Sequence, residues 1–337
     1  MRIRRMRDGI SSWLKGHHRY ATPGGIVAAV LLGAALAGGA LAGVGWAAGY
    51  GRVWQLVDDA NWVWLPVAVG CVFVSHVGYT LAYREVAQIQ NGPRVSVGLA
   101  GMSVLAGFGM LIPRAGFRMD QAILEEHGFS GDAARGVVRR LGMLEYAILG
   151  PTTLVAAVVL LIEHFHSEGG VLLSWVVGVP AGSAIALLLI ANRERLPQKG
   201  KVWTELRCVL DAVASLRALA QCATGLLAIV GMAMYWAADI TALGACLAVV
   251  QHEVPPAVLI VGYATGYAMT RRSLPFAGAG AAEALMPFAM HWMSVPLAAA
   301  VFAVFAYRVC NLWLPLAPAA LALRRLRNLP VLLPSTA

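Results

Sequence analysis

Long apolar stretches alternate with short polar ones along most of the chain. Runs of about 20 apolar residues are long enough to cross a bilayer as α-helices, whereas a membrane β-barrel would need alternating segments of about ten residues. The pattern therefore predicts an all-α integral membrane protein. We expect about six full transmembrane helices, over residues 23–49, 62–83, 141–165, 171–191, 221–250 and 295–323.

Two further apolar segments are interrupted by polar residues before they reach full length. Residues 95–112 run into the sequence PRAGFRMD, and residues 256–293 contain the sequence TRRSLPFAGAGAAEAL. If residues 95–112 crossed fully, the arginine-rich stretch that follows would lie on the far side of the membrane. A re-entrant hairpin keeps that stretch cytoplasmic, as the positive-inside rule favours, and we prefer it to the alternative of a full span.

The two interrupted segments share one order of features: an apolar glycine-rich run, a P-x-x-G break, a short helix and a long span with an ionisable group. The predicted topology places one hairpin on the cytoplasmic side and the other outside, so residues 95–165 and 256–323 form an inverted repeat. Paired breaks of this kind indicate the binding site of a transporter. The residues of the pattern are Pro113, Gly116, Asp120 and Glu145 in the first half and Pro275, Gly278, Glu283 and Arg308 in the second.

Arginines lie beside both breaks. A helix that restarts after Gly280 would present unpaired N–H groups and a positive dipole end to a phosphate or carboxylate, and neighbouring arginines would add bidentate donors. A capping role for Glu283 in the first turn of that helix is an equally good explanation of its position. The predicted substrate-binding residues are Arg114, Gly116, Arg118, Arg271, Arg272, Pro275, Gly278, Gly280, Glu283 and Arg308.

Four other ionisable residues lie in or near apolar segments and are candidates for a cavity: Asp120, Glu145, Asp239 and His76. Charge is costly inside a bilayer, so each is a functional hypothesis. Simpler alternatives are a neutral His76 bonded to a neighbouring helix and a structural salt bridge between Glu145 and Arg308.

Composition agrees with the membrane class. Only 13% of the residues are charged, against about 25% in soluble domains. The net charge of +9 gathers in loops beside the apolar runs, so we expect cytoplasmic termini in the cell inner membrane and no nucleic-acid binding. The predicted organisation is a basic segment, 1–22, a single transmembrane domain, 23–327, and a tail, 328–337.

Motifs for cofactors and catalysis are lacking from the sequence. The five cysteines form no C-x-x-C pair and no His/Cys cluster at metal-ligand spacing, so we expect neither a metal nor a disulfide framework. There is no nucleotide-binding loop and no catalytic serine motif. We therefore expect no cofactor and no enzymatic activity.

Several short motifs resemble the transmembrane, flippase-type domain of lysylphosphatidylglycerol synthetases. Residues 277–283, AGAGAAE, and the pair Tyr307 and Arg308 are similar to the P-G-G-x-G-x-x-E and Y-R signatures of that family, although Phe276 and Ala277 replace its proline and first glycine. Pro113, Gly116 and Arg118 match its first hairpin. The similarity covers roughly residues 23–327, and the ending YRVCNLWLPLAPAALALRRLR is similar to members associated with hopanoid lipid genes.

This resemblance implies a lipid-translocating or lipid-handling membrane protein. The family's aminoacyl transfer belongs to a separate soluble domain, and the chain stops 14 residues after Leu323, so we expect a stand-alone member. The leading hypothesis is a flippase that binds membrane lipid in the bilayer. The alternatives are a non-transporting scaffold for a separate lipid-modifying enzyme, and a membrane transferase with Asp120, Asp239 or Glu283 as its acid or base.

Overall fold

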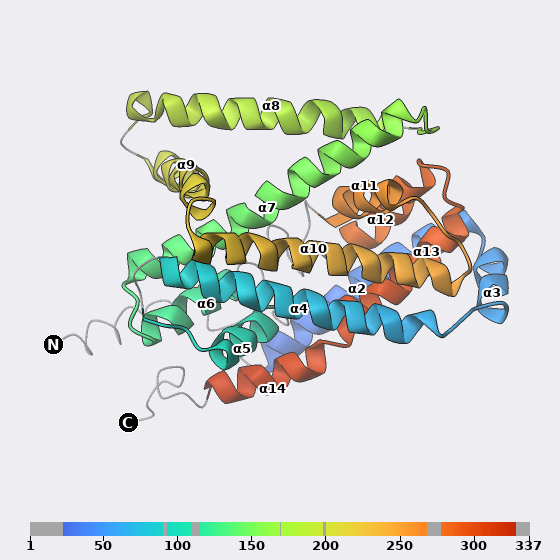
Figure 1. The fold of residues 1–337 in the computed structure, drawn as a ribbon. Coiled ribbons are helices and arrows are strands. Elements are labelled where there is room, and N and C mark those ends of the chain that lie inside the picture. Colours follow the sequence, from blue (N-terminus) through green and yellow to red (C-terminus); the bar gives the residue numbers. More distant parts are fainter. Residues whose placement is uncertain are drawn as a thin grey trace.

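The computed structural model describes residues 23–89, 93–108, 115–168, 170–197, 200–267 and 278–327, and every regular element among them is a helix (Figure 1). Six segments are long and apolar enough to cross a membrane, which confirms the prediction of an all-α membrane protein. They are α2 (Pro23–Ala48), α4 (Trp64–Ile89), α7 (Gly131–Ile162), α8 (Val171–Ala191), α10 (Ala223–Val249) and the segment Leu297–Ala322.

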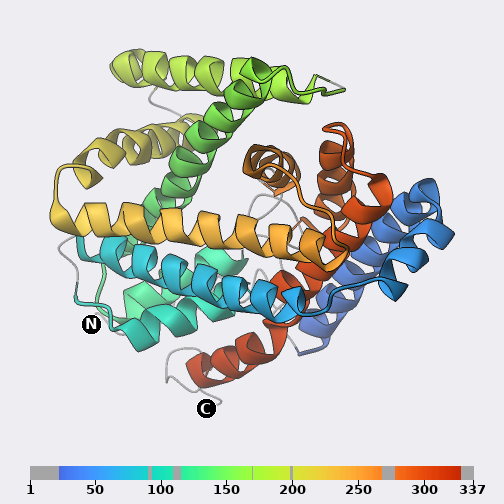
Figure 2. The ribbon, with the colours of Figure 1, turned by 45° about the vertical axis from the view of Figure 1, so that its right-hand side comes forward.

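The last of these segments changes direction within the bundle. It consists of α13 (Leu297–Arg308), a π-helical turn η3 (Val309–Trp313) and α14 (Leu316–Arg327). A π turn and a nearby proline, Pro315, are recognised causes of helix kinks. As a result α14 runs at an angle to α13 (Figures 1 and 2).

Helix α7 begins ten residues earlier than predicted. The Ser130 hydroxyl accepts a hydrogen bond from the Ala133 N–H at 3.3 Å and caps the helix at this point. The 32-residue helix is about 48 Å long, well beyond the hydrocarbon thickness of about 30 Å. Its polar first turns, with Arg135 and Arg139, therefore extend past the apolar part of the span.

Each interrupted segment forms two short helices. They are α5 (Val97–Phe108) with α6 (Ala115–Glu126), and α11 (Pro256–Tyr267) with α12 (Ala281–His291). At 11 or 12 residues each helix is about 18 Å long, too short to cross about 30 Å of hydrocarbon. The partners in each pair pack against each other.

Both pairs are hairpins that return to the end of the bundle where they start. In the second pair, Gly262 faces Met290 while Gly266 faces the backbone of Met286, so α11 and α12 are antiparallel. In the first pair, Gly128, two residues after the end of α6, lies against Pro93, just before α5.

Helices α4 and α10 pack closely against each other. These helices are antiparallel, because the Asn61 N–H before α4 donates to the Val249 carbonyl at the end of α10, at 2.7 Å. They cross at Gly78 and Gly231, where a Cβ on either glycine would lie 2.7–2.8 Å from backbone atoms of the partner helix. The helices that follow α4 and α10 make matching contacts. Helix α5, which follows α4, packs against α14, and helix α11, which follows α10, packs against α7.

Similar pairs of helices come before α4 and before α10. Before α4 come α2 and α3 (Tyr50–Asp58), and before α10 come α8 and α9 (Lys201–Leu219). Helices α2 and α3 pack against α13, just as α8 and α9 pack against α7. Each half therefore consists of a span, an amphipathic helix, a second span, a hairpin and a third span.

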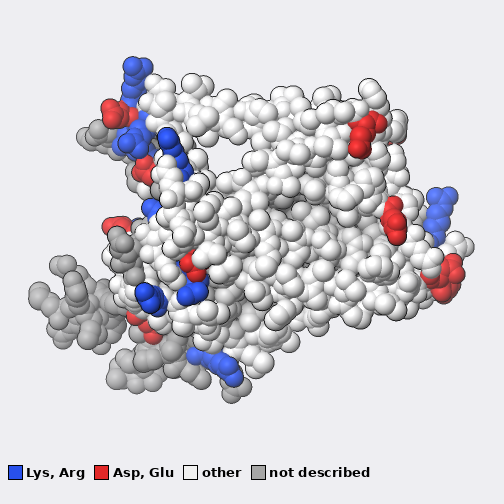
Figure 3. Space-filling view, viewed as in Figure 1, with Lys and Arg blue, Asp and Glu red and all other residues white. Residues whose placement is uncertain are grey.

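On the face shown in Figure 3, charged side chains lie mainly toward the two ends of the bundle, with a zone of uncharged residues between them. Basic residues predominate where α4 ends and α10 begins, and acidic residues predominate at the opposite end. The basic end includes Arg84, Arg94, Arg135, Arg139, Arg140, Arg193, Arg195, Arg207 and Arg217. The opposite end includes Asp58, Asp59, Glu163, Glu168 and Glu253, with Arg52.

Candidate functional site

Asp239, on α10, is the centre of a buried polar cluster. Its side chain is inaccessible to solvent, and both carboxylate oxygens accept hydrogen bonds from other elements. Asn311 of η3 donates to Oδ1 at 2.6 Å, Tyr307 of α13 donates to Oδ2 at 2.8 Å, and Tyr263 of α11 also donates to Oδ2. The cluster thus joins the second hairpin to two spans at the carboxylate.

Glu283 and Arg308 form a buried ion pair beside this cluster. The Arg308 Nε donates to Glu283 Oε1 at 2.6 Å, and the two side chains are 2% and 0% exposed. Glu283 Oε2 accepts from the Gly280 N–H at 2.7 Å and so caps α12. The expected capping role is confirmed, and the same carboxylate holds Arg308, a partner that was not predicted from the sequence.

Glycine is required at the break before α12. Gly278 and Gly280 have φ angles of 70° and 89°, in the left-handed region that side-chain-bearing residues rarely adopt. The chain can therefore turn into α12 with the Gly280 N–H directed toward the Glu283 carboxylate. This local geometry explains why two glycines precede the glutamate.

Glu145, on α7, is joined to the same core from the first half. Its carboxylate accepts from the Tyr79 hydroxyl at 2.5 Å, and its backbone carbonyl accepts from the Trp236 indole N–H at 3.0 Å. Aromatic side chains continue from there to the Asp239 cluster. The ring centroids are 5.8 Å apart between Trp236 and Tyr263 and 6.0 Å apart between Tyr263 and Tyr307.

These contacts form one buried chain of polar and aromatic groups across both halves, which we call the polar core: Tyr79, Glu145, Trp236, Asp239, Tyr263, Glu283, Tyr307, Arg308 and Asn311. Five of its members were not predicted as site residues: Tyr79, Trp236, Tyr263, Asn311 and Tyr307, the last of which was noted only as part of the Y-R motif. Apart from that motif, only Asn311 has a signal in the sequence, because it is a polar amide inside an apolar span. Tyrosine and tryptophan have no comparable signal, since they also occur as ordinary packing residues.

The other predicted site residues are placed only in part. His76 is buried on α4 with its Nδ1 2.8 Å from the Val72 carbonyl, and Asp120 is buried on α6 against Gly107 of α5. Gly116 and Arg118 belong to α6, and the Arg118 side chain lies outside the described part of the structure. Outside the described residues lie Arg114, Arg271, Arg272 and Pro275.

Two grooves with mostly apolar walls lie between the helices. One, of about 730 Å³, is formed by α7, α10 and α11 and includes Thr152 and Thr241. The other, of about 660 Å³, is formed by α4, α5 and α14 and includes His76. Neither groove is lined by Asp239, Glu283 or Arg308, although Trp236 of the polar core lines the first of them.

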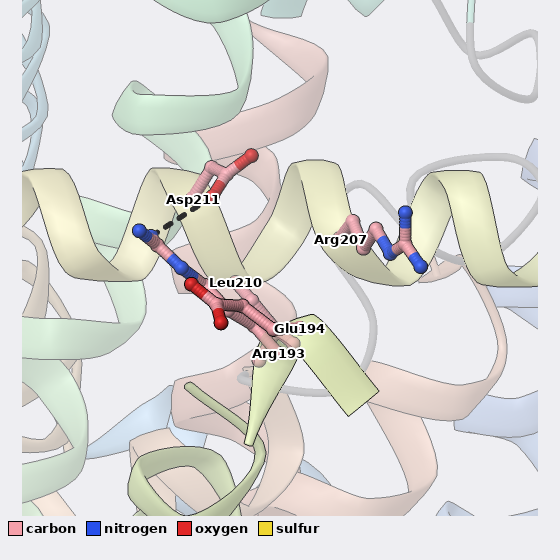
Figure 4. Close-up of a pocket in the computed structure, with 5 residues that line it drawn as sticks. All are labelled: Arg193, Glu194, Arg207, Leu210 and Asp211. Carbon is pink, nitrogen blue, oxygen red and sulfur yellow. Dashed lines mark ion pairs between the residues drawn. The ribbon is translucent and has the colours of Figure 1, made fainter. Parts of the chain in front are cut away.

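A third, charged cleft of about 490 Å³ lies between the short helix η1 (Arg193–Arg195) and α9. Arg193 pairs with Asp211 at 3.7 Å, while Arg207 lies farther along α9 and donates to the Pro197 carbonyl at 2.8 Å (Figure 4). The cleft therefore combines both signs of charge, which gives it no preference for an anion. Among the described residues, no group of three or more His, Cys, Asp or Glu could hold a metal ion.

Comparison with known families gives one match that covers most of the chain. A family model described as the lysylphosphatidylglycerol synthase TM region matches residues 26–319. The matched region runs from α2 into α14 and contains both hairpins and the whole polar core. No curated protein matches the chain.

Proposed function

This chain belongs to the lysylphosphatidylglycerol synthase TM region family, and we propose that it moves a lipid with a polar, phosphate-bearing headgroup across the membrane. It is a multi-pass membrane protein with six apolar crossing segments. In this proposal the headgroup passes between the two hairpins while the acyl chains stay in the bilayer, and the chain performs no catalytic step. Membrane lipid is its substrate.

The polar core is the observation that carries the proposal. Ionisable groups inside a membrane are costly, and they commonly mark substrate or ion pathways. Here Asp239, Glu283 and Arg308 are all buried. The hydrogen bonds from Tyr263 to Asp239 and from Arg308 to Glu283 join the second hairpin to α10 and α13. Hydrogen bonds of this kind can be exchanged for bonds to a headgroup when the hairpin moves.

The inverted repeat supplies a means of alternating access. In transporters with inverted repeats, substrate sites lie at the repeat interface, beside broken helices, and one half rocks against the other. We place the basic end of the bundle in the cytoplasm of the cell, by the positive-inside rule, and the protein in the inner membrane. The hairpins then enter as re-entrant segments from opposite sides.

Headgroup translocation in proteoliposomes tests the proposal. A fluorescent phospholipid and an impermeant quencher report transfer, with wild type compared with an Arg271→Ala/Arg272→Ala variant. We expect protein-dependent transfer that the variant loses, because the two arginines beside the second break are the expected phosphate donors. Absence of transfer by wild type across several lipid classes would instead favour a scaffold that docks a lipid-modifying enzyme through residues 192–207.

Asp239→Asn is expected to slow lipid transfer about tenfold while the protein remains folded. Asparagine keeps the shape of the side chain but replaces one accepting oxygen of the carboxylate by an NH2 group, which donates. The side chain therefore loses a hydrogen bond that the charged carboxylate accepts, and a bond of this kind is worth about 1.5–3 kcal/mol. The measurement is the initial transfer rate in the same proteoliposomes.

The matched control for this variant is Thr153→Val. Thr153 is equally buried on α7, but its hydroxyl donates only to its own helix, at the Leu149 carbonyl. Wild-type transfer in a folded Asp239→Asn variant would remove Asp239 from the pathway.

A further inference from the structure

The groove between α4, α5 and α14 is lined by apolar side chains that are exposed on the outside of the bundle, such as Phe73, which is 70% exposed. Helix α5 packs against both α4 and α14, and these helices lie together at the same side of the bundle (Figures 1 and 2). Apolar side chains such as Val72, Phe73 and Leu105 form most of its walls. Its volume of about 660 Å³ lies in the range of about 300–1,000 Å³ found for ligand sites.

One face of α4 gives this groove a polar stripe. His76, Thr80 and Arg84 follow one another at intervals of four residues, which places them on the same face of the helix, and all three line the groove. Thr80 donates to the His76 carbonyl at 2.8 Å, within its own helix. Arg84 is therefore the group of this stripe that brings charge to the groove.

Arg84 has donors to offer an anion. Its Nη1 lies 3.2 Å from Glu85 Oε1, and its side chain is 36% exposed. Its Nε is buried, and among the residues that the structure describes nothing accepts a hydrogen bond from it. The exposed part of the guanidinium can donate charge-assisted hydrogen bonds to a phosphate.

The depth of the groove in the membrane matches a phospholipid. Arg84 lies five residues before the end of α4 at Ile89, about 8 Å along the helix, which is the level of the headgroups when α4 spans the bilayer. From Arg84 to Val69 the groove follows α4 for about 22 Å. This is longer than half of the hydrocarbon core of about 30 Å, so the groove can hold an acyl chain of one leaflet.

We propose that this groove is a binding site for an anionic phospholipid, whose phosphate is held by Arg84 and one of whose acyl chains lies along α4 toward Val69. The site is separate from the polar core, and its occupancy does not require that the protein transport lipid. Loss of lipid binding here and loss of transfer are therefore distinguishable results.

Native mass spectrometry of the purified full chain tests the proposal. Phosphatidylglycerol and phosphatidylcholine are added in equal amounts, and the retained lipid is counted for each variant. We expect wild type to retain phosphatidylglycerol in excess and Arg84→Ala to retain about tenfold less of it, because a charge-assisted bond is lost. Arg135→Ala is the control, since Arg135 is exposed at the same end and paired with Asp132.

A second pair of variants tests the acyl-chain part of the groove. A Cβ on Gly101 would meet only the Thr80 methyl group, at 3.8 Å, so Gly101→Leu extends into the groove without a backbone clash and should displace the lipid. Gly98→Leu, on the same helix with no atom within 4 Å of its Cβ, should bind as wild type. Equal phosphatidylglycerol retention by wild type and Arg84→Ala, or undiminished retention by Gly101→Leu, would overturn the proposal.

Discussion

Arg308→Met is expected to lower the free energy of unfolding by about 3–5 kcal/mol, the usual cost of removing one partner of a buried ion pair. The substitution leaves the Glu283 carboxylate, which is inaccessible to solvent, without its 2.6 Å partner. The Gly280 N–H still donates to this carboxylate, but one amide cannot replace a guanidinium. Unfolding in mixed micelles of increasing denaturing detergent measures the loss.

The double variant Arg308→Met/Glu283→Gln separates the charge from the packing. Glutamine keeps the oxygen that caps α12 and removes the uncompensated charge, so the double variant should regain at least half of the lost stability. We expect this recovery because most of the lost stability comes from the unpaired charge that remains buried when only one member of the ion pair is removed. Equal instability of the single and double variants would show that Arg308 acts through its size rather than its charge.

Gly78→Val is expected to destabilise the protein by about 3 kcal/mol or more, at or above the upper end of the usual cost of overpacking. The first added carbon would lie 2.7 Å from both the Gly231 carbonyl oxygen and the Tyr235 nitrogen. These are backbone atoms of α10, so the clash can be relieved only by separating the two central helices. The measurement is the melting temperature in detergent, together with the monodisperse fraction on size exclusion.

Gly70→Val is the matched control for this variant. Gly70 lies on the same helix, and a Cβ there would have no neighbouring atom within 4 Å, so only a small change in helix propensity remains. A melting temperature that falls equally in both variants would mean that the crossing point is not the sensitive site.

Much of the fold follows from the length of apolar runs, because a bilayer has a fixed thickness. Helix α8 has the predicted bounds, residues 171–191, since polar or glycine residues lie directly at both ends of its apolar run. The start of α7 could not be found in the same way. Its first ten residues are helical but polar, and nothing in a hydropathy pattern distinguishes a helix that continues out of the membrane from a loop.

The candidate site was predictable where it depends on local chemistry. The glycines before Glu283 need positive φ angles, and the glutamate reaches back only three residues to cap α12. Pairing across the fold was not predictable. Arg308 binds a carboxylate 25 residues away, and Asp239 meets Asn311 across 72 residues, so these partners depend on how the hairpin packs between spans.

The exposure of α8 has a consequence for how the molecule occupies its membrane. None of the most apolar stretch of this helix is buried, and it packs mainly against α7 and α9, so a wedge-shaped opening separates it from the rest of the bundle (Figure 3). Apolar surfaces in a bilayer do not enclose empty space. We therefore expect lipid to fill the space between α8 and the rest of the bundle. Removing that lipid during purification should let α8 move toward α10, which would be measured as a smaller hydrodynamic radius.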